Sequence, residues 1–175
     1  MTLENPGKTG VKKETGLPNE AASSQQLGDF LPYQLSIASN MVSALIAERY
    51  RKRFGLKIPE WRVMAVLGDA TDGDGSMTQR ALTEVTLMDK VAVNRACKVL
   101  EERGLVGRVP NASDGRSHLL ALTQEGRAIH AEVMPLALAT EKEIFDGFSE
   151  ADRKKLRTML DRLRQRVTEL GGDLA

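Results

Sequence analysis

Apolar residues recur every three or four positions from residue 31 onward, which is the period of helices that pack on one side. This spacing predicts a first helix over about residues 32–53 that carries two neighbouring apolar stripes. A second helix is predicted from Ile58 to about Asp69. One stripe suffices to bury one side of a helix, so we expect the first helix to bury more than one side.

Polar capping residues divide the middle of the chain into two short helices. Thr78 is placed to cap a helix over about residues 79–86. Asp89 is placed to cap a longer helix that runs to about residue 103. The two residues between these helices predict a tight turn.

The pattern changes period after residue 104. Alternation of apolar and polar residues predicts a β-hairpin over residues 105–122 with a polar turn at residues 111–116. The helical period then returns in a long helix to about Phe148 and in a final helix with a single apolar stripe that ends at Gly171-Gly172.

The order of these elements predicts a mainly α fold with a small β-hairpin wing. Two short helices joined by a tight turn and followed by a hairpin describe a winged helix-turn-helix, here over residues 58–122. Residues 30–55 and 123–172 form the flanking helical region. Residues 1–26 are polar with little apolar content and predict a flexible tail.

Composition narrows the possible chemistry. The 175 residues are 41% apolar and 28% charged, which is typical of about one domain with its own core. Lys and Arg number 25 against 24 Asp and Glu, for a formal net charge of +1. This balance excludes a polycation that binds nucleic acid by bulk charge, so a basic site has to be local.

Several classes of site are not expected. Cys97 is the only cysteine, so no disulfide forms within the chain and a cytoplasmic location is favoured. One cysteine and two histidines cannot build the common zinc sites. The GxGxxG, Walker A, HExxH and GxSxG motifs are absent, which predicts no cofactor, no catalytic residues and no enzyme. No stretch approaches 18 consecutive apolar residues, so no membrane span is expected.

The helix over residues 90–103 has the chemistry of a recognition helix. One face is apolar, and the other offers Lys90, Val91, Asn94, Arg95 and Lys98. Asparagine pairs with adenine, arginine with guanine, and lysine with phosphate. At the tip of the hairpin, Arg116 stands two residues from Asp114, whose carboxylate can orient the guanidinium toward a minor groove.

The order and spacing of these features resemble the MarR family of bacterial transcription regulators over about residues 30–170. The segments that carry the resemblance are Ile58-Pro59-Glu60-Trp61-Arg62-Val63, Thr78-Gln79 with Leu82, Asp89-Lys90 with Val93 and Arg95, Leu100-Glu101-Glu102-Arg103-Gly104-Leu105-Val106, Asp114-Gly115-Arg116, Leu120-Ala121-Leu122-Thr123, and Gly126. The resemblance implies an obligate homodimer, in which the first and last helices interlock, on a pseudo-palindromic site in double-stranded DNA. The two-striped first helix and the striped last helix match this expectation.

The resemblance assigns DNA contacts and also marks departures from the family pattern. The residues expected to contact DNA are Thr78, Gln79, Lys90, Val91, Ala92, Asn94, Arg95, Lys98, Asp114 and Arg116. Many members carry Ser-Thr where this chain has Val91-Ala92, so the base sequence that it reads is expected to differ. Our hypotheses are thymine-methyl contact by Val91 or Ala92 and adenine readout by Asn94.

The resemblance further implies a repressor that a small effector releases, namely an aromatic or phenolic acid or its CoA thioester. The matching positions on the first, second and fifth helices are Tyr33, Ser36, Asn40, Trp61, Arg62, Met64, His130 and Met134. One arginine in an apolar slot would suit a carboxylate. For Trp61 and Met64, a plain core role is the alternative.

His118 is the other residue considered for effector response. It shares strand parity with Leu120 and Leu122, so we expect it to point inward. It is then either a core histidine with a satisfied hydrogen bond or a coupler between the wing and a ligand or proton.

Three alternatives to a ligand-released repressor stay open. One is a ligand-independent or redox-controlled regulator that uses Cys97, although a small core residue is the simpler interpretation of this cysteine. A second is a winged-helix module that binds protein in place of DNA. The third is an enzyme whose site leaves no motif.

Overall fold

The computed structural model describes residues 27–70, 75–111 and 117–171. The expected tail over residues 1–26 and the hairpin tip with Asp114 and Arg116 lie outside the described residues. The chain divides into two units, Met1–Ile37 and Ala38–Ala175. In the first unit, the described residues form a short 3-10 helix, Leu27–Asp29, and the first turns of helix α1, where the Gln34 amide donates to the Gly28 carbonyl.

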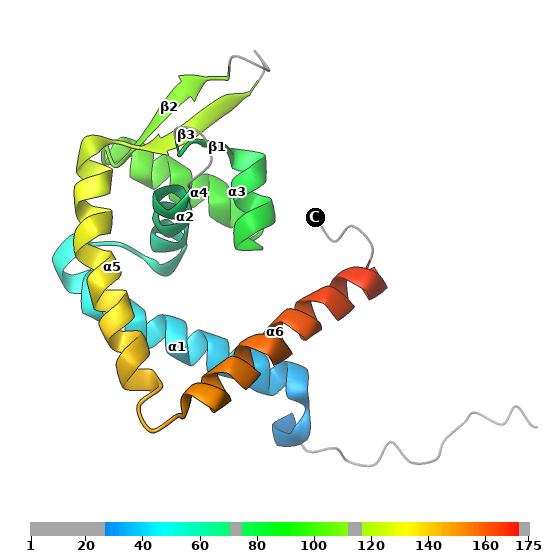
Figure 1. Ribbon diagram of the computed structural model, residues 1–175. Helices are drawn as coiled ribbons and strands as arrows, with labels where there is room; N and C mark the ends of the chain where they lie inside the picture. The colour runs from blue at the N-terminus through cyan, green and yellow to red at the C-terminus, as the bar shows by residue number, and fades with distance from the viewer. Residues whose placement is uncertain (1–26, 71–74, 112–116, 172–175) are drawn as a thin grey trace, which may run out of the picture. The chain divides into compact units, whose positions relative to one another are not determined.

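Helix α1 spans Leu31–Phe54 and confirms the first predicted helix (Figure 1). Gly55 ends it with a φ of +63°, a left-handed conformation that suits glycine. Only Ala47 and Tyr50 of α1 are buried. Leu45 of one stripe and Ile37 of the other stay exposed, so the chain by itself covers neither stripe completely.

Three helices of the second unit follow the predicted caps. Helix α2 spans Ile58–Asp69, α3 spans Gln79–Thr86 and α4 spans Lys90–Glu102. Thr78 Oγ1 accepts from the Ala81 amide at 3.1 Å, and Asp89 Oδ1 accepts from the Ala92 amide at 2.8 Å. Each side chain satisfies an amide that the first helical turn leaves without a partner, and this fixes where the helix begins.

The sheet contains the predicted hairpin and one further strand. Strands β2 (Val106–Pro110) and β3 (His118–Leu122) pair antiparallel, and β1 (Met77–Thr78) pairs with the other side of β3. Sequence analysis missed β1, because two residues are too few to show an alternating pattern. Figure 1 shows the hairpin extending beyond the helices that it packs against.

Two long helices complete the second unit, α5 (Gln124–Ile144) and α6 (Glu150–Gly171). The prediction that the fifth helix reaches Phe148 was wrong by four residues, because Gly147 adopts a φ of +81° in the turn between the two helices. Ser149 and Asp152 then cap α6 reciprocally, with Ser149 Oγ accepting from the Asp152 amide at 3.1 Å. No helix in the described part of the chain combines the length and the apolar character that crossing a membrane requires.

The core lies among α2, α3, α4 and the base of the hairpin. Its fully enclosed side chains include Val63, Leu82, Val93, Leu100 and Leu120. Helix α6 contributes no buried residue. The core therefore holds the helix-turn-helix and the hairpin together and gives α4 a fixed base from which its other face looks outward.

Candidate nucleic-acid interface

Helix α4 has the two faces that the sequence predicted. Val93, Ala96, Cys97 and Leu100 are buried. The exposed side chains on the opposite face are Lys90, Val91, Asn94, Arg95 and Lys98, whereas Ala92 is half-buried. The helical period turns these five side chains outward together, so the structure brings five of the ten candidate DNA contacts onto one surface.

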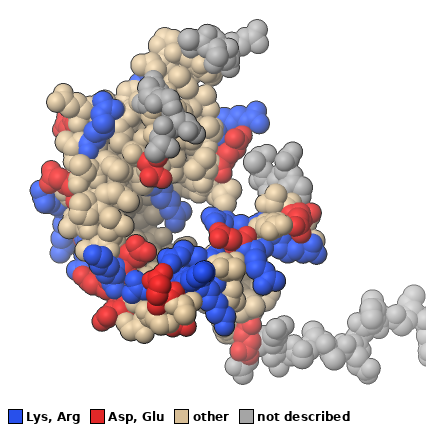
Figure 2. All heavy atoms as spheres, in the orientation of Figure 1, with Lys and Arg blue, Asp and Glu red and all other residues tan. Residues whose placement is uncertain are grey.

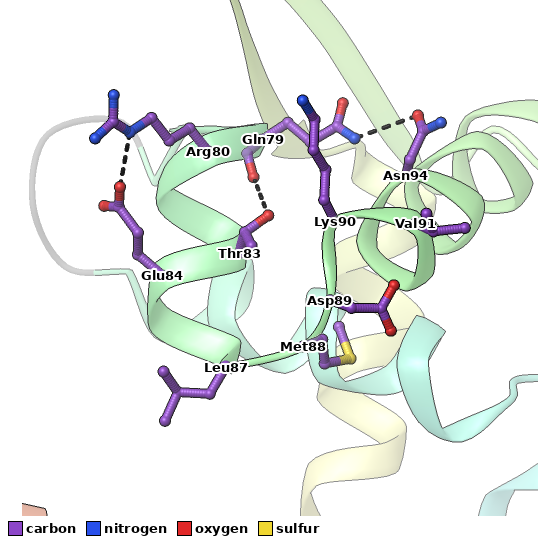
Figure 3. A pocket seen from close by; sticks show the side chains of 10 residues that line it. All are labelled: Gln79, Arg80, Thr83, Glu84, Leu87, Met88, Asp89, Lys90, Val91 and Asn94. Carbon is purple, nitrogen blue, oxygen red and sulfur yellow. Dashed lines mark hydrogen bonds and ion pairs between the residues drawn. The ribbon is translucent and has the colours of Figure 1, made fainter. Parts of the chain in front are cut away.

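A groove of about 990 Å³ runs between α3 and α4 (Figure 3). Its lining residues are Gln79, Arg80, Thr83, Glu84, Leu87, Met88, Asp89, Lys90, Val91 and Asn94. Three of the residues expected from the sequence on α4 and one on α3 thus share one concave surface. Thr78 stands at the start of α3, where its hydroxyl is used to cap the helix.

Leu87 stands out in the turn between α3 and α4. It has a φ of +51°, and its side chain is 81% exposed. Non-glycine residues seldom adopt this left-handed conformation. The turn holds because the Leu87 amide donates to the Thr83 carbonyl at 3.0 Å, which closes the end of α3 and directs the chain into the Asp89 cap.

The charges along this surface are unevenly compensated. Arg80 pairs with Glu84 at 2.8 Å, and this bond raises the pKa of the guanidinium. Lys98 lies 3.8 Å from Glu102. Lys90 and Arg95 form no ion pair within the described residues. These two cations can therefore meet an external anion without first giving up an acidic partner.

Two polar residues of the surface are bonded to each other. Gln79 Nε2 donates to Asn94 Oδ1 at 3.2 Å, which links the first turn of α3 to the exposed face of α4 (Figure 3). Both residues were predicted as DNA contacts, but sequence spacing gave no sign of this bond, because it joins residues that are 15 positions apart.

An ion pair that was not predicted from the sequence links the base of the hairpin to α4. Arg108 of β2 donates to both carboxylate oxygens of Glu101, at 2.7 and 3.2 Å. These bonds raise the pKa of the Arg108 guanidinium. The only sequence signal is an acid at the end of the helix and an arginine just after the following turn. The pair fixes the direction in which the hairpin leaves the recognition helix.

The prediction that His118 is buried with Leu120 and Leu122 was wrong. His118 is exposed, although Leu120 and Leu122 on the same strand are buried as expected. His118 pairs with Pro110 at the far end of the β2–β3 ladder, and both are exposed there. Strand parity therefore gave the correct face, but the core does not extend far enough along the strand to cover this residue.

The predicted effector positions are only partly brought together. Trp61 stacks on His130 with ring centroids 5.5 Å apart, which joins α2 to α5. Arg62 is exposed and donates to Ser43 at 3.2 Å. Met64 is fully buried in the core, so it offers no surface to a ligand in this conformation.

The remaining effector positions are exposed or lie at the margin of the core. Met134 on α5 is half-buried against it. Asn40 on α1 is exposed. Tyr33 and Ser36 belong to the first unit, where both are exposed, and His118 lies on the hairpin.

A cavity of about 460 Å³ lies beside His130. It is lined by Leu67, Gly68, Ala70, Gly75, Leu122, Arg127 and His130. The imidazole packs directly on Gly68, where an added Cβ would come within 2.4 Å of Nε2. That nitrogen is buried and has no hydrogen-bond partner among the described residues. Burial lowers the pKa of His130, against a smaller opposing effect of Asp69.

Cys97 lies at the core side of α4 and is wholly enclosed. Burial, assisted by the negative charge of Glu101, raises the pKa of its thiol to about 11. Oxidants react with the thiolate, which is scarce near neutral pH at such a pKa. The geometry therefore fits a small core residue and disfavours redox control through this cysteine.

Comparisons with known proteins agree with this arrangement. Residues 54–117, which hold α2 to α4 and strand β2, match the model of the MarR family. The HTH-type transcriptional regulator YwoH of Bacillus subtilis (strain 168) is 30% identical over 118 residues, covering 66% of this chain and 82% of YwoH. The HTH-type transcriptional repressor IacR of Pseudomonas putida is 26% identical over 117 residues, covering 65% of this chain and 66% of IacR.

The structural likeness extends beyond the matched segment. The crystal structure of BpsR from Bordetella bronchiseptica superimposes with a TM-score of 0.68 at 23% identity, covering 83% of this chain and 97% of BpsR. It shares the fold, including the helices that flank the winged region. With an outward-facing α4, a groove beside it and a matching family model, this chain belongs to the MarR family of transcriptional regulators.

Proposed function

We propose that this protein is a homodimeric repressor in the cytoplasm that binds a pseudo-palindromic operator and releases it when a small aromatic acid binds. Members of its family are transcriptional regulators and not enzymes. The observation that carries the proposal is the exposed face of α4, where Lys90 and Arg95 have no acidic partner among the described residues and Lys90 lines the α3–α4 groove. Such a face supplies phosphate and base contacts from one rigid helix.

The dimer is supported by apolar surface that one chain leaves uncovered. Helix α6 exposes an apolar stripe made of Leu156, Met159, Leu160, Leu163, Val167 and Leu170, and the first half of α1 is exposed as well. Contiguous apolar surface of this kind marks an interface. A symmetric dimer would place two α4 helices on the two halves of an inverted repeat.

Two similar proteins support the proposals that this protein represses transcription and that an aromatic acid releases it from DNA. IacR, which resembles this chain, is named as a repressor. BpsR, which shares the fold, has its DNA binding regulated by 6-hydroxynicotinic acid, a hydroxylated aromatic acid. Exposed Arg62 offers a cation to the carboxylate of an acid of this class, and half-buried His130 lines the cavity of about 460 Å³. An effector acts only if it binds the DNA-free conformation more tightly.

The test is selection of bound duplexes from a random DNA pool by the full-length protein at physiological salt. We expect enrichment of an inverted repeat whose half-sites are about one helical turn, roughly 34 Å, apart. The selected duplex is then titrated with hydroxylated aromatic acids, and we expect at least one of them to release the protein.

The controls separate the parts of the proposal. An Arg95→Ala variant should bind the selected duplex more weakly. The slope of its log binding constant against log salt concentration should be smaller in magnitude by about one. Exposed Arg162 on α6 is the matched control, and Arg162→Ala should leave the affinity unchanged. If the wild-type protein enriches no sequence and binds all duplexes alike, the proposed function is refuted.

A further inference from the structure

The Gln79–Asn94 bond joins the two helices of the helix-turn-helix at the surface that faces outward. Gln79 is the first residue of α3, and Asn94 lies on the exposed face of α4. Gln79 Nε2 donates to Asn94 Oδ1 at 3.2 Å, and both side chains line the groove. Half-buried Gln79 and exposed Asn94 both lose rotamer freedom in this bond, in which Asn94 Oδ1 is turned toward Gln79.

The bond occupies one end of each amide and leaves the other end available. Asn94 Oδ1 accepts, so the two N–H donors on Nδ2 remain, and Gln79 keeps its acceptor Oε1. Within the described residues no other hydrogen bond involves either of these atoms. Figure 3 shows the Asn94 nitrogen turned away from the Gln79 amide. The surface thus offers a donor from α4 and an acceptor from α3 in a fixed arrangement.

Both residues of this pair belong to helical turns that are capped by side chains. The Thr83 hydroxyl donates to the Gln79 carbonyl at 3.0 Å, and Thr78 caps the same helical turn. Asp89 caps α4 one turn before Asn94, and Val93 anchors that turn in the core. The orientation of the Asn94 amide is therefore set by Gln79 and not by movement of the helices.

We propose that Gln79 is a positioning residue for base recognition, which holds the Asn94 amide so that Nδ2 donates to a base edge in the major groove. The inference rests on the proposed function and deepens it by naming what the pair reads. An unrestrained asparagine can turn either end toward DNA and reads adenine with both. With Oδ1 engaged by Gln79, the donor faces the DNA.

This orientation of the Asn94 amide predicts which base lowers the affinity for DNA. Guanine and adenine offer the acceptor N7 in the major groove, and thymine offers O4. Cytosine offers only its N4 amino group, which is a donor and leaves the Asn94 N–H without a partner. The base opposite Asn94 is therefore any base except cytosine, and the expected discrimination against cytosine is roughly five- to tenfold.

The test changes the donor at residue 79 and measures base preference at each operator position. In Gln79→Glu, the carboxylate only accepts, so Asn94 turns to donate Nδ2 to it and presents Oδ1 to the DNA. We expect the preference at that position to invert toward cytosine and adenine, which carry amino groups. In Gln79→Ala the refusal of cytosine should relax, and in Asn94→Ala it should disappear.

The added negative charge cannot be mistaken for a change in base preference, because it lowers the affinity of a variant for all operators alike. The ratio of affinities for two operators that differ in one base is therefore unaffected by it. Gln124→Glu makes the same chemical change on exposed α5, outside the groove, and should leave every ratio unchanged. If Gln79→Glu weakens binding equally for all four bases at every position, Gln79 has no positioning role and the inference is overturned, while the proposed function stands. If the wild-type protein selects no sequence, both are refuted.

Discussion

The winged-helix region and helix α6 differ in where their apolar residues lie. In the winged-helix region, side chains such as Val63, Leu82, Leu100 and Leu120 are fully enclosed by their own chain. Helix α6 has apolar residues at the same helical spacing but none that is buried. The same pattern of residues thus has two outcomes, an internal core in one region and, in the other, an uncovered apolar stripe that we propose as the dimer interface.

The polar face of α6 sharpens this difference. Charged residues of both signs lie on α6 (Figure 2), seven basic and four acidic, and Arg157, Arg164 and Arg166 each pair with an acid of the same helix. Exposed pairs of this kind contribute little to stability, on the order of 0.5 kcal/mol each. Because α6 buries none of its residues within its own chain, its apolar stripe is the feature to test.

The largest expected effect comes from charges in that stripe. In Leu156→Lys/Leu163→Lys, two ammonium groups would have to be buried in the proposed dimer interface, which costs several kcal/mol. We expect the dimer dissociation constant to rise at least roughly 100-fold, as measured by sedimentation equilibrium. Gln165→Lys adds a charge on the polar side of the same helix and should leave the dimer intact. A double variant that keeps the wild-type mass would show that this stripe is not the interface.

The second expected effect is on the core of the winged-helix region. Leu100→Ala leaves a cavity under α4 and should lower the free energy of unfolding by about 2–5 kcal/mol in urea denaturation. Val91→Ala, on the exposed face of the same helix, should change it by less than about 0.5 kcal/mol. Both are measured at one protein concentration, because dimerisation contributes to stability. Equal effects would mean that the two faces of α4 do not differ as described.

The parts of the fold that the sequence predicted well are those with local chemical signals. Thr78 and Asp89 cap their helices through side-chain bonds three residues along the chain, so the starts of α3 and α4 could be read from the sequence. The apolar face of α4 followed from the helical period alone. The end of α5 was misplaced, because the turn at Gly147 has no polar cap to announce it.

What the sequence could not predict depends on how far the core reaches and on pairs that are distant along the chain. His118 has the parity of a buried residue, but the core ends before its position on β3. The bonds of Arg108 to Glu101 and of Gln79 to Asn94 join different elements, and no periodicity encodes them. The DNA contacts predicted at Asp114 and Arg116, outside the described residues, stay predictions.

The smallest expected effect lies at the contact between α2 and α5, where His130 packs on Trp61 and Gly68. Its pKa is lowered from the ordinary value of 6.5 by burial, with Asp69 opposing. Between pH 6.5 and the lower pKa of His130 in the folded protein, the unfolded chain therefore binds a proton at this histidine that the folded chain does not bind. The free energy of unfolding should fall through this window as the pH decreases. The stabilising contribution of neutral His130 should be present in full above pH 6.5.

The expected loss is on the order of 0.5 kcal/mol, because solvent partly screens a half-buried ring. Urea denaturation at about pH 7.5 and about pH 5.5 measures it. His130→Phe keeps an aromatic ring on Trp61 without a titrating group, so its unfolding should depend less on pH than that of the wild type. His118→Phe removes the exposed histidine of the hairpin and tests whether the effect belongs to His130. Parallel pH profiles for wild type and His130→Phe would mean that this packed imidazole does not couple protonation to the fold, and that the α2–α5 contact behaves like the rest of the core.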